Sequence, residues 1–410
     1  MPETISLNNF ANIMGVSRRT VENWVAKGRY IPIERINGQC FFSLEQLRTI
    51  PIVKEMIESS WEIEMNTIPQ RVFTSIELFA GAGGLALGFE KAGFHHIMLN
   101  EFNHDACETL RLNRPHWNVL EDDVHNIDFS QWRNQIDLLT GGFPCQAFSY
   151  AGNKGGFADT RGTLFFEVAR AVAEINPKVF VCENVKGLAS HDKGRTLSVI
   201  RNVIADLGYT LVEPQVLKAI RYQVPQKRER IVLVAIRNDI APRVSFRWPA
   251  PYYRIMTLND AFKQGELYLT DVPKSIGVKY PEKKERVLDL VPQGGDWRNL
   301  PEDIAREYMG GSYLLGGGKT GMARRLSMDE PSLTLTCSPA QKQTERCHPI
   351  ETRPLTVREY ARIQTFPDEW QFAGNMTAQY KQIGNAVPVN LSWAVARAVM
   401  RLMNDIDALA

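Results

Sequence analysis

The sequence of 410 residues predicts a doubly wound α/β fold over residues 71–237. Three observations predict it: short apolar runs recur along this stretch, helical stretches separate them, and glycines directly follow the first run. Strands joined by helices of this length pair in parallel, with helices on both faces of the sheet. In such a fold, ligands bind at the carboxyl ends of the strands.

Each apolar run has the length and composition of a buried strand. The expected strands are 72–78, 96–100, 136–140, 179–182, 210–216 and 231–236, with a further short strand before Asp123. The stretches between them have helical length and spacing. The expected helices are 85–92, 105–113, 164–175 and 196–207.

Residues 1–50 form a separate small unit in this interpretation. Gly15 ends a first helix, and Ser17 is a candidate N-cap for a second. Helix, glycine turn and helix resemble the winged helix-turn-helix of MerR-like and excisionase-like regulators. Arg18, Arg19 and Thr20, at the start of the second helix, are then candidates to contact operator DNA. The alternative is a helical hairpin that packs on the main body.

The rest of the chain divides by composition. Residues 51–70 are expected to be a linker, and residues 238–350 are rich in glycine, proline, tyrosine and tryptophan and predict a second, irregular domain. The run GGGKTG at 316–321 lacks the first glycine of a phosphate loop, so we interpret it as a glycine-rich loop. In residues 351–410, helices at 354–363 and 388–403 are apolar enough to pack back on the first domain.

Composition excludes several classes of protein. The formal net charge of +2 neither demands nor forbids nucleic acid, so a basic surface must be local. Six scattered cysteines form no metal-binding pattern and no disulfide framework, which predicts no metal and a reducing compartment. The sequence shows neither a signal peptide nor a run of eighteen apolar residues. We therefore expect a cytoplasmic protein without membrane contact.

The run SIELFAGAGG (75–84) is a strand that leads into glycines at the start of a helix. Gly81, Gly83 and Ala86 satisfy the dinucleotide-binding pattern GxGxxA. Glu101 and Asp123 each follow a later strand, where carboxylates can accept hydrogen bonds from ribose and adenine. These residues alone fit a nicotinamide cofactor as well as an adenosyl one.

The run GGFPCQAFS (141–149) places two glycines and a proline directly before a cysteine at a strand end. Proline fixes φ, and glycines allow sharp turns, so this arrangement can hold the thiol of Cys145 in one pose. The alternative for this run is a turn with a buried, unreactive cysteine.

Five motifs in order carry a more specific resemblance. They are GGFPCQAFS, FVCENVKGL (180–188), QKRERIVLVA (226–235), RPLTVREYARIQTFPD (353–368) and QIGNAVPVN (382–390). With FAGAGG before them, the chain resembles the DNA cytosine-5 methyltransferases of bacterial restriction-modification systems from residue 71 onward, except in the variable region. The resemblance implies a Rossmann-like methyltransferase domain and a target-recognition domain at 238–350.

The resemblance also implies catalytic roles. Cys145 would be the nucleophile that adds to C6 of cytosine, which turns C5 into a carbon able to accept a methyl group. Glu183 and Asn184 belong to the Glu-Asn-Val motif, and Glu183 would act near N3 as an acid kept protonated by its apolar strand. Arg228 and Arg230 would point to one side, orient the base at O2 and support the catalytic loop.

The implied methyl donor is S-adenosyl-L-methionine, with S-adenosyl-L-homocysteine as product. Its implied contacts are Phe79, Ala80, Gly81, Gly83, Gly84, Glu101, Phe102, Asp123, Val124, Pro144, Leu164, Asn385 and Val387. Glu77 and Phe102 depart conservatively from the usual family residues.

The implied partner is double-stranded DNA, from which the base must be flipped. Ser149 and Lys154 lie in a glycine-rich loop that is similar to the mobile loop of this family. We expect a monomer in catalysis, with a dimer through residues 1–50 as an option at an operator. The N-terminal unit would then regulate transcription of the enzyme's own gene.

Three other functions stay open at this point. The family includes a branch that methylates tRNA. A DNA-binding regulator on an inactive methyltransferase fold is a second alternative, which the intact Cys145, Glu183, Arg228 and Arg230 argue against. A nicotinamide oxidoreductase rests only on GxGxxA and leaves the Pro-Cys and Glu-Asn-Val motifs unexplained.

Overall fold

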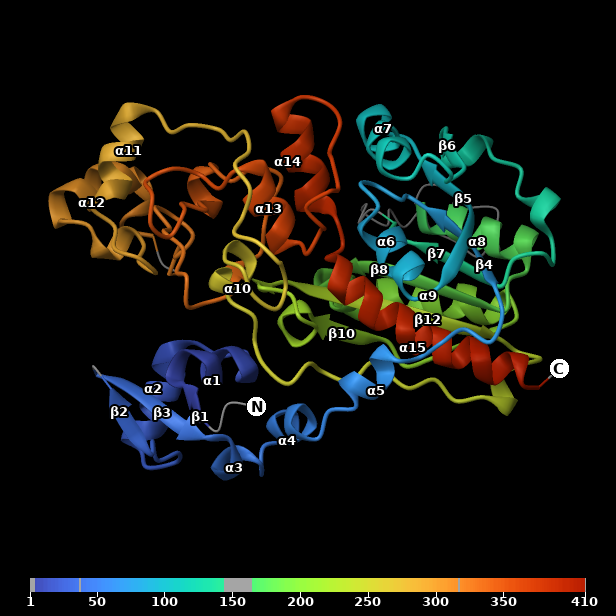
Figure 1. The fold of residues 1–410 in the computed structure, drawn as a ribbon, viewed down its shortest axis with the longest axis horizontal. Helices are drawn as coiled ribbons and strands as arrows, with labels where there is room; N and C mark the ends of the chain where they lie inside the picture. Colours follow the sequence, from blue (N-terminus) through green and yellow to red (C-terminus); the bar gives the residue numbers. More distant parts are fainter. Residues whose placement is uncertain (1–3, 37, 144–163, 316–317, 410) are drawn as a thin grey trace.

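The computed structural model describes residues 4–36, 38–143, 164–315 and 318–409. A central sheet with its helices forms the body of the molecule (Figure 1). The region between β12 and α13 lies at one end of this body, and the small N-terminal unit lies beneath that end.

The central sheet has the strand order β10-β12-β8-β7-β4-β5-β6, with β9 beside β12. Its strands are β4 (Phe73–Leu78), β5 (Phe94–Glu101), β6 (Val119–Glu121), β7 (Leu138–Gly141), β8 (Val179–Val185), β9 (Tyr209–Leu211), β10 (Gln215–Lys218) and β12 (Glu229–Arg237). Strands β4 to β8 pair in parallel, as the alternation of strands and helices predicts.

The prediction of a parallel sheet is wrong at one edge. β12 pairs antiparallel with β8, β9 and β10, so the sheet is mixed. The connection from β10 to β12 is shorter than a parallel crossover requires, so these strands can only lie antiparallel. The stretch 210–216, expected as one strand, contributes to two short strands, β9 and β10.

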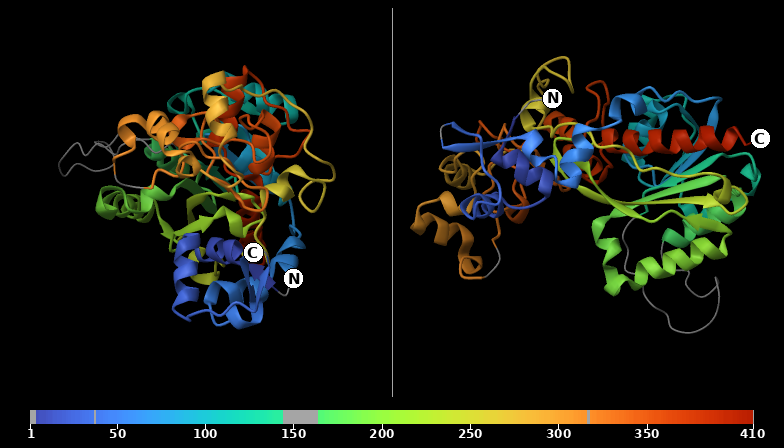
Figure 2. Two further views of the ribbon diagram at one scale, coloured as in Figure 1. Left: turned by 90° about the vertical axis from the view of Figure 1, so that its left-hand side faces the viewer. Right: turned by 90° about the horizontal axis from the view of Figure 1, so that it is seen from below.

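Helices cover both faces of the sheet (Figure 2). α6 (Gly84–Lys91) and α15 (Val389–Asp407) pack on one face, and α8 (Leu164–Ile175) and α9 (Arg195–Asp206) on the other. Along β8, Val179 and Val181 join the first layer, whereas Phe180 and Cys182 join the second. Burial on both faces explains why the sequence shows apolar runs rather than polar alternation.

α15 crosses α6 at close range because α6 presents two glycines to it. A Cβ atom on Gly88 would overlap the Oγ of Ser392, and one on Gly84 would overlap the carbonyl oxygen of Val387. Ser392 Oγ also donates to the Leu85 carbonyl at 2.7 Å. This contact holds α15 on α6 and brings the residues before α15 to the carboxyl edge of the sheet.

The N-terminal unit contains the two helices that its sequence predicts, α1 (Leu7–Met14) and α2 (Arg18–Ala26). Gly15 ends α1 with a positive φ of 70°, and the Ser17 hydroxyl accepts from the Thr20 backbone N–H. A three-stranded sheet and a short helix accompany them: β1 (Thr4–Ser6), β2 (Glu34–Ile36), β3 (Gln39–Ser43) and α3 (Leu44–Leu47).

Residues 51–70, expected as a linker, contain two short helices. They form α4 (Pro51–Ile57) and α5 (Trp61–Met65), and both helices pack against other parts of the chain. Trp61 is 1% exposed, and its ring faces Tyr252 and Trp393 at centroid distances of 5.2 and 6.4 Å. The guanidinium of Arg397 lies 4.3 Å from the rings of both Trp61 and Trp393.

The region after β12 has little regular structure, as its composition predicts. Its helices and strands, together with β11 before β12, are β11 (Gln226–Lys227), α10 (Leu258–Phe262), α11 (Glu282–Asp289), α12 (Glu302–Met309) and β13 (Ser332–Leu333). β11 pairs in parallel with β13 and so fastens this region to the body. α7 (His104–Asn113), α13 (Val357–Ile363) and α14 (Met376–Asn385) complete the described helices of more than one turn.

Glu77, in β4, holds a carboxyl group inside the protein. Its Oε1 accepts from the Ala86 backbone N–H, and its Oε2 accepts from the Thr140 hydroxyl, each at 3.1 Å. The side chain is fully buried, and this burial raises its pKa to about 8. Glu77 therefore joins α6 to β7 across β4 and is protonated at neutral pH.

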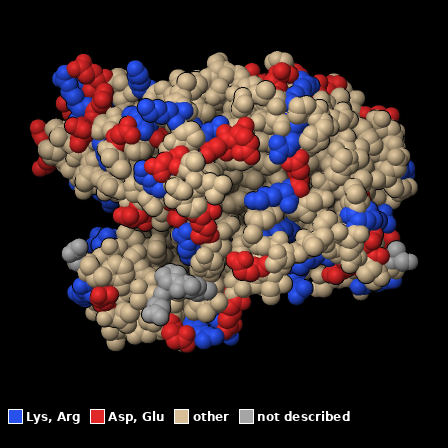
Figure 3. Space-filling view, in the orientation of Figure 1, with Lys and Arg blue, Asp and Glu red and all other residues tan. Residues whose placement is uncertain are grey.

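The surface in Figure 3 carries acidic and basic side chains interspersed, in keeping with the small net charge. None of the described helices is both long enough and apolar enough to cross a membrane.

Replacing Trp61 with alanine should lower the free energy of unfolding by about 3–5 kcal/mol, because it empties a buried aromatic site. Urea unfolding at neutral pH measures this loss. Ile63→Ala on the same helix is the matched control, since Ile63 is 76% exposed and should change stability by less than about 0.5 kcal/mol. Equal effects of the two substitutions would contradict the packing described here.

Replacing Glu77 with glutamine should flatten the dependence of stability on pH. The buried carboxyl has a pKa of about 8 against an ordinary 4.5, so between these values the folded state binds more protons than the unfolded state. Stability then falls as pH rises through this window, by at most about 1.4 kcal/mol per pH unit from this group. Urea unfolding between about pH 6 and 8 should show a smaller decline for Glu77→Gln. Parallel profiles would contradict the buried, protonated carboxyl.

Candidate functional site

A cleft of about 1230 Å³ opens where β4 to β8 end at their carboxyl edge. Residues from the strand ends, from α14 and from the loop before α15 form its wall. Among the residues expected from the sequence, the wall contains Phe79, Ala80, Gly81, Gly84, Glu101, Phe102, Asp123, Val124, Leu164, Glu183, Asn184, Arg228, Arg230, Asn385 and Val387. The structure therefore brings most of both predicted sets into one space.

The glycine turn after β4 shapes one end of the cleft. Gly83 precedes α6 with a φ of 84°, and a Cβ there would lie 2.8 Å from Leu110 and 2.9 Å from Trp370. Gly83 was expected to contact the cofactor, but it is not part of the cleft wall. It forms the turn before α6 instead. Gly84 allows the carbonyl of Val387 to approach the start of α6.

Two acidic side chains face this end of the cleft in different settings. Glu101 accepts hydrogen bonds from the backbone N–H groups of Gly81, at 2.8 Å, and Asn103, at 2.7 Å. Asp123 accepts from the backbone N–H of His125 at 3.0 Å, and this bond, together with the His125 ring, holds the pKa of Asp123 below its ordinary value. Asp123 therefore presents an ionised carboxylate to the cleft at neutral pH.

Apolar side chains complete the same end. Phe102 and Val124 both belong to the cleft wall; Phe102 is 75% exposed, whereas Val124 is buried. Leu164, at the start of α8, and Val387 add further apolar wall. Two carboxylates and exposed apolar surface in one cleft suit a ligand that carries hydroxyl and amino groups on a flat ring system, such as a nucleoside.

Glu183 lies at the other end of the cleft, near the end of β8. Its carboxyl is 9% exposed, and Arg230 Nε lies 2.5 Å from its Oε1 as an ion pair. On adjacent strands the two residues are diagonal neighbours of one face, since Arg230 lies opposite Val185. Burial raises the pKa of Glu183 above its ordinary value, although the charges of Arg230 and Arg228 oppose this shift.

Asn184 fixes the backbone that precedes Cys145. Its Nδ2 donates to the carbonyl of Phe143 at 2.9 Å, two residues before the cysteine. A Cβ on Gly142 would lie 3.2 Å from Oε2 of Glu183, so glycine at this position leaves room for the carboxyl. Gly142 thus lets the chain just after β7 pass close to the end of β8.

Arg228 and Arg230 do not share one role. Strand β12 begins at Glu229, so the alternation that would align the two arginines does not reach Arg228. Arg228 is 2% exposed and donates to the carbonyls of Leu335, at 3.2 Å, and Gly384, at 2.9 Å. Burial lowers its pKa to about 9. Arg228 therefore joins three chain segments, whereas Arg230 pairs with Glu183.

Several expected residues lie elsewhere. Pro144, Cys145, Ser149 and Lys154 fall outside the described residues. Arg18, Arg19 and Thr20 lie on α2, apart from the cleft wall, and the Thr20 hydroxyl lies 2.8 Å from that of Ser17.

Sequence reasoning missed other residues of the wall. They are Ala82, Leu85, Asn100, Asn103, Asp105, Ala106, His125, Gly142, Phe143, Val185, Asn375, Thr377, Ala378, Lys381, Gln382 and Ala386. Several lie on or next to α14, and the helical stretch just before the motif QIGNAVPVN is the signal that could have indicated them.

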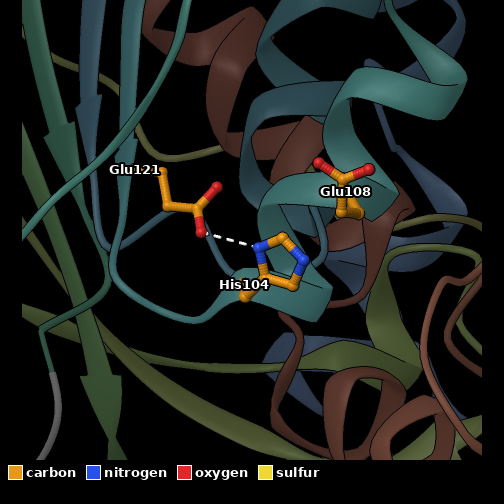
Figure 4. Close-up of side chains that lie close together, drawn as sticks. All are labelled: His104, Glu108 and Glu121. Carbon is orange, nitrogen blue, oxygen red and sulfur yellow. Dashed lines mark hydrogen bonds and ion pairs between the residues drawn. The ribbon is translucent and has the colours of Figure 1, made fainter.

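One group of described residues brings possible metal ligands within 4.8 Å of one another: His104, Glu108 and Glu121 (Figure 4). His104 Nδ1 lies 2.7 Å from Glu121 Oε1. Arg111 contacts both carboxylates, at 2.8 Å from Glu108 and 2.6 Å from Glu121. Since the guanidinium already supplies the positive charge, this group needs no ion, and we assign none to it.

Solved structures resemble this fold. A protein described as a DNA modification methyltransferase encoded within an Escherichia coli prophage aligns with a TM-score of 0.58 at 24% identity, over 81% of this chain and 99% of that one. Dnmt2 methyltransferase of S. pombe aligns with a TM-score of 0.52 at 18% identity, over 81% and 98%. At these identities the likeness concerns the fold alone.

Sequence comparison is more specific. Residues 73–401 match the model of the C-5 cytosine-specific DNA methylase family. Type II methyltransferase M.Eco47II of Escherichia coli is 60% identical over 99% of this chain and 98% of its own length. Type II methyltransferase M.PspPI of Psychrobacter sp. (strain TA137) is 57% identical over 96% and 95%. The sheet, the cleft at its carboxyl edge and these matches agree: the chain belongs to the C-5 cytosine-specific DNA methylase family.

Proposed function

We propose that the protein is a type II modification methyltransferase that methylates C5 of cytosine in a short sequence of double-stranded DNA. The methyl group would protect the DNA from a cognate restriction enzyme. The observation that carries this proposal is the position of Asn184, which holds the carbonyl of Phe143 just before Pro144 and Cys145. The same cleft contains Glu183, Arg230 and the two acids of a nucleoside site.

The residues present fit S-adenosylmethionine as cofactor. Glu101 would accept from the ribose hydroxyls and Asp123 from the adenine amino group, while Phe79, Phe102 and Val124 offer apolar contact. Leu164, Asn385 and Val387, which line the same cleft, would enclose the methionine end. S-adenosylmethionine, when bound, supplies an electrophilic methyl group.

The chain's own residues would activate the base. The thiolate of Cys145 adds to C6 of a flipped cytosine, which makes C5 nucleophilic, and it leaves again once C5 has gained the methyl group and lost its proton. A protonated Glu183 can donate to N3 and stabilise the charge that develops on addition. Its Oε1 lies 2.5 Å from Nε of Arg230, and its Oε2 lies beside Gly142, where glycine leaves room for the carboxyl.

The arginines support this chemistry differently. Arg230 would orient the base and balance the negative charge that Glu183 carries once it has donated its proton, since Arg230 Nε lies 2.5 Å from Glu183 Oε1. Arg228 would act as a positioning residue, since its N–H groups already hold Leu335 and Gly384. Ser149 and Lys154 would contact DNA from the loop after Cys145. The region 238–350 would read base edges in the grooves of the duplex.

Replacing Cys145 with alanine should abolish methylation, by at least about 10,000-fold, because the covalent step has no substitute. Bisulfite sequencing of the expression plasmid measures this directly. Wild-type protein should protect cytosines in one recurring context, and Cys145→Ala should protect none. Cys40→Ala, in β3 of the N-terminal unit, is the matched control and should protect the same context.

Folded wild-type protein that protects no cytosine would overturn the proposal. Methyl transfer to tRNA in a competition between duplex DNA and tRNA would then identify the RNA-directed alternative.

Replacing Glu101 with glutamine should weaken the binding of S-adenosylhomocysteine about tenfold, because a charged acceptor becomes a neutral one. Isothermal titration calorimetry measures this change. Glu90→Gln is the matched control, since Glu90 pairs with Arg114 on the surface of α6 and is not in the cleft wall. Unchanged affinity of Glu101→Gln would remove Glu101 from the cofactor site.

A further inference from the structure

The end of β10 lies on the catalytic edge of the sheet. Lys218, its last residue, pairs with Glu229, and Leu217 pairs with Arg230. Arg230 in turn lies opposite Val185, the last residue of β8. Neighbouring strands are about 4.8 Å apart, so the end of β10 lies roughly 10 Å along this edge from the end of β8.

The N-terminal unit is attached at this point. Ile220, just after β10, and Ile255 are buried in one apolar cluster with residues of α1, α2 and α4. A Cβ on Gly15, between α1 and α2, would overlap the ammonium group of Lys218. In Figure 1 the unit lies below and to the left of β10. The turn between α1 and α2 therefore lies against the end of β10.

Positive charge gathers along this edge. Lys186 follows β8 and is 60% exposed, with one ion pair to Glu229 at 2.8 Å. Lys218 is half-buried, and burial lowers its pKa. The nearby charges of Arg221 and Lys186 lower this pKa further, whereas Glu229 opposes the shift. Arg221 is half-buried, with Glu55 and Glu229 near it, and its Nε has no hydrogen-bond partner among the described residues.

The start of α2 adds two exposed cations, Arg18 and Arg19. Its first turn contains no acidic residue, and Glu22, one turn later, pairs with Arg18 at 2.7 Å. Positive side chains in a first turn oppose the helix dipole, and of these two arginines only Arg18 has an ion pair within α2. We define Lys186, Lys218, Arg18 and Arg19 as the basic strip.

We propose that the basic strip binds backbone phosphates of the DNA that flanks the methylated base, so that the N-terminal unit acts on the same duplex as the catalytic site. This inference rests on the proposed function, because that duplex must enter the cleft. Like charges held together along a surface suit a polyanion. The apolar cluster that includes Ile220 and Ile255 holds α2 against the body of the protein. The N-terminal unit is therefore not free to bind a separate operator independently of the body.

The test compares two duplexes centred on the sequence that bisulfite sequencing identifies, one of about 14 and one of about 30 base pairs. Fluorescence anisotropy in the presence of S-adenosylhomocysteine gives the affinity of the full-length protein for each. At salt concentrations between about 50 and 200 mM, wild type should bind the long duplex about tenfold more tightly, since the short duplex lacks the flanking phosphates that the basic strip would neutralise. The double variant Arg18→Ala/Arg19→Ala should lose this preference, with a salt slope smaller by about 1.8.

A second variant and a control test whether the length preference depends on the basic strip in particular. Lys218→Gln, on a different element, should also reduce the length preference. Arg48→Ala/Lys54→Ala removes two exposed charges from the α3–α4 side of the same unit and should leave the preference for the long duplex unchanged. Circular dichroism confirms that each variant is folded.

Three results would overturn the inference: an unchanged length preference in Arg18→Ala/Arg19→Ala, an equal loss on both duplexes, or tight wild-type binding to a promoter fragment that lacks the methylated sequence. The last result would identify a separate operator. Failure of the proposed function is distinguishable, because wild type would then produce no 5-methylcytosine in any duplex.

Discussion

The close contact between α6 and α15 is the constraint on which the cleft depends. Glycine at positions 84 and 88 lets the C-terminal helix lie directly on the helix that follows the first strand. That contact places Asn385 and Val387 opposite Glu101 and Asp123, although these residues come from opposite ends of the domain. A side chain at either glycine would separate the two walls. The cofactor end of the site is thus a consequence of helix packing.

The surroundings of each carboxyl group set its pKa and therefore its role. Glu77 is buried between two strands and a helix and is protonated at neutral pH. Asp123 is bonded to a backbone N–H at the surface and is ionised. For Glu183, burial raises the pKa above its ordinary value, while the charge of the arginine at 2.5 Å opposes the shift. Position on the sheet therefore decides which acid can give a proton and which can only accept hydrogen bonds.

The antiparallel edge of the sheet connects catalysis to the rest of the chain. β12 brings Arg230 to Glu183 and, through β10, sets the place where the N-terminal unit is attached. Arg228 lies just before this strand and joins the body to the carbonyls of Leu335 and Gly384. The family match begins at residue 73, whereas the 60% identical relative is aligned over 99% of this chain, so the N-terminal unit is shared with that relative.

The sequence by itself determined the strands, most helices, the glycine turn and the motifs of the cleft, because these depend on residues close together in the chain. Ser17 and Gly15 bound α2 and α1 through local hydrogen bonds and a positive φ, so their places could be predicted. The pairing of β12 with β8 and the partners of Arg228 could not be predicted, because both depend on the tertiary structure. Those partners are backbone carbonyls of remote segments, which carry no sequence signal and become neighbours only once the strand order is set.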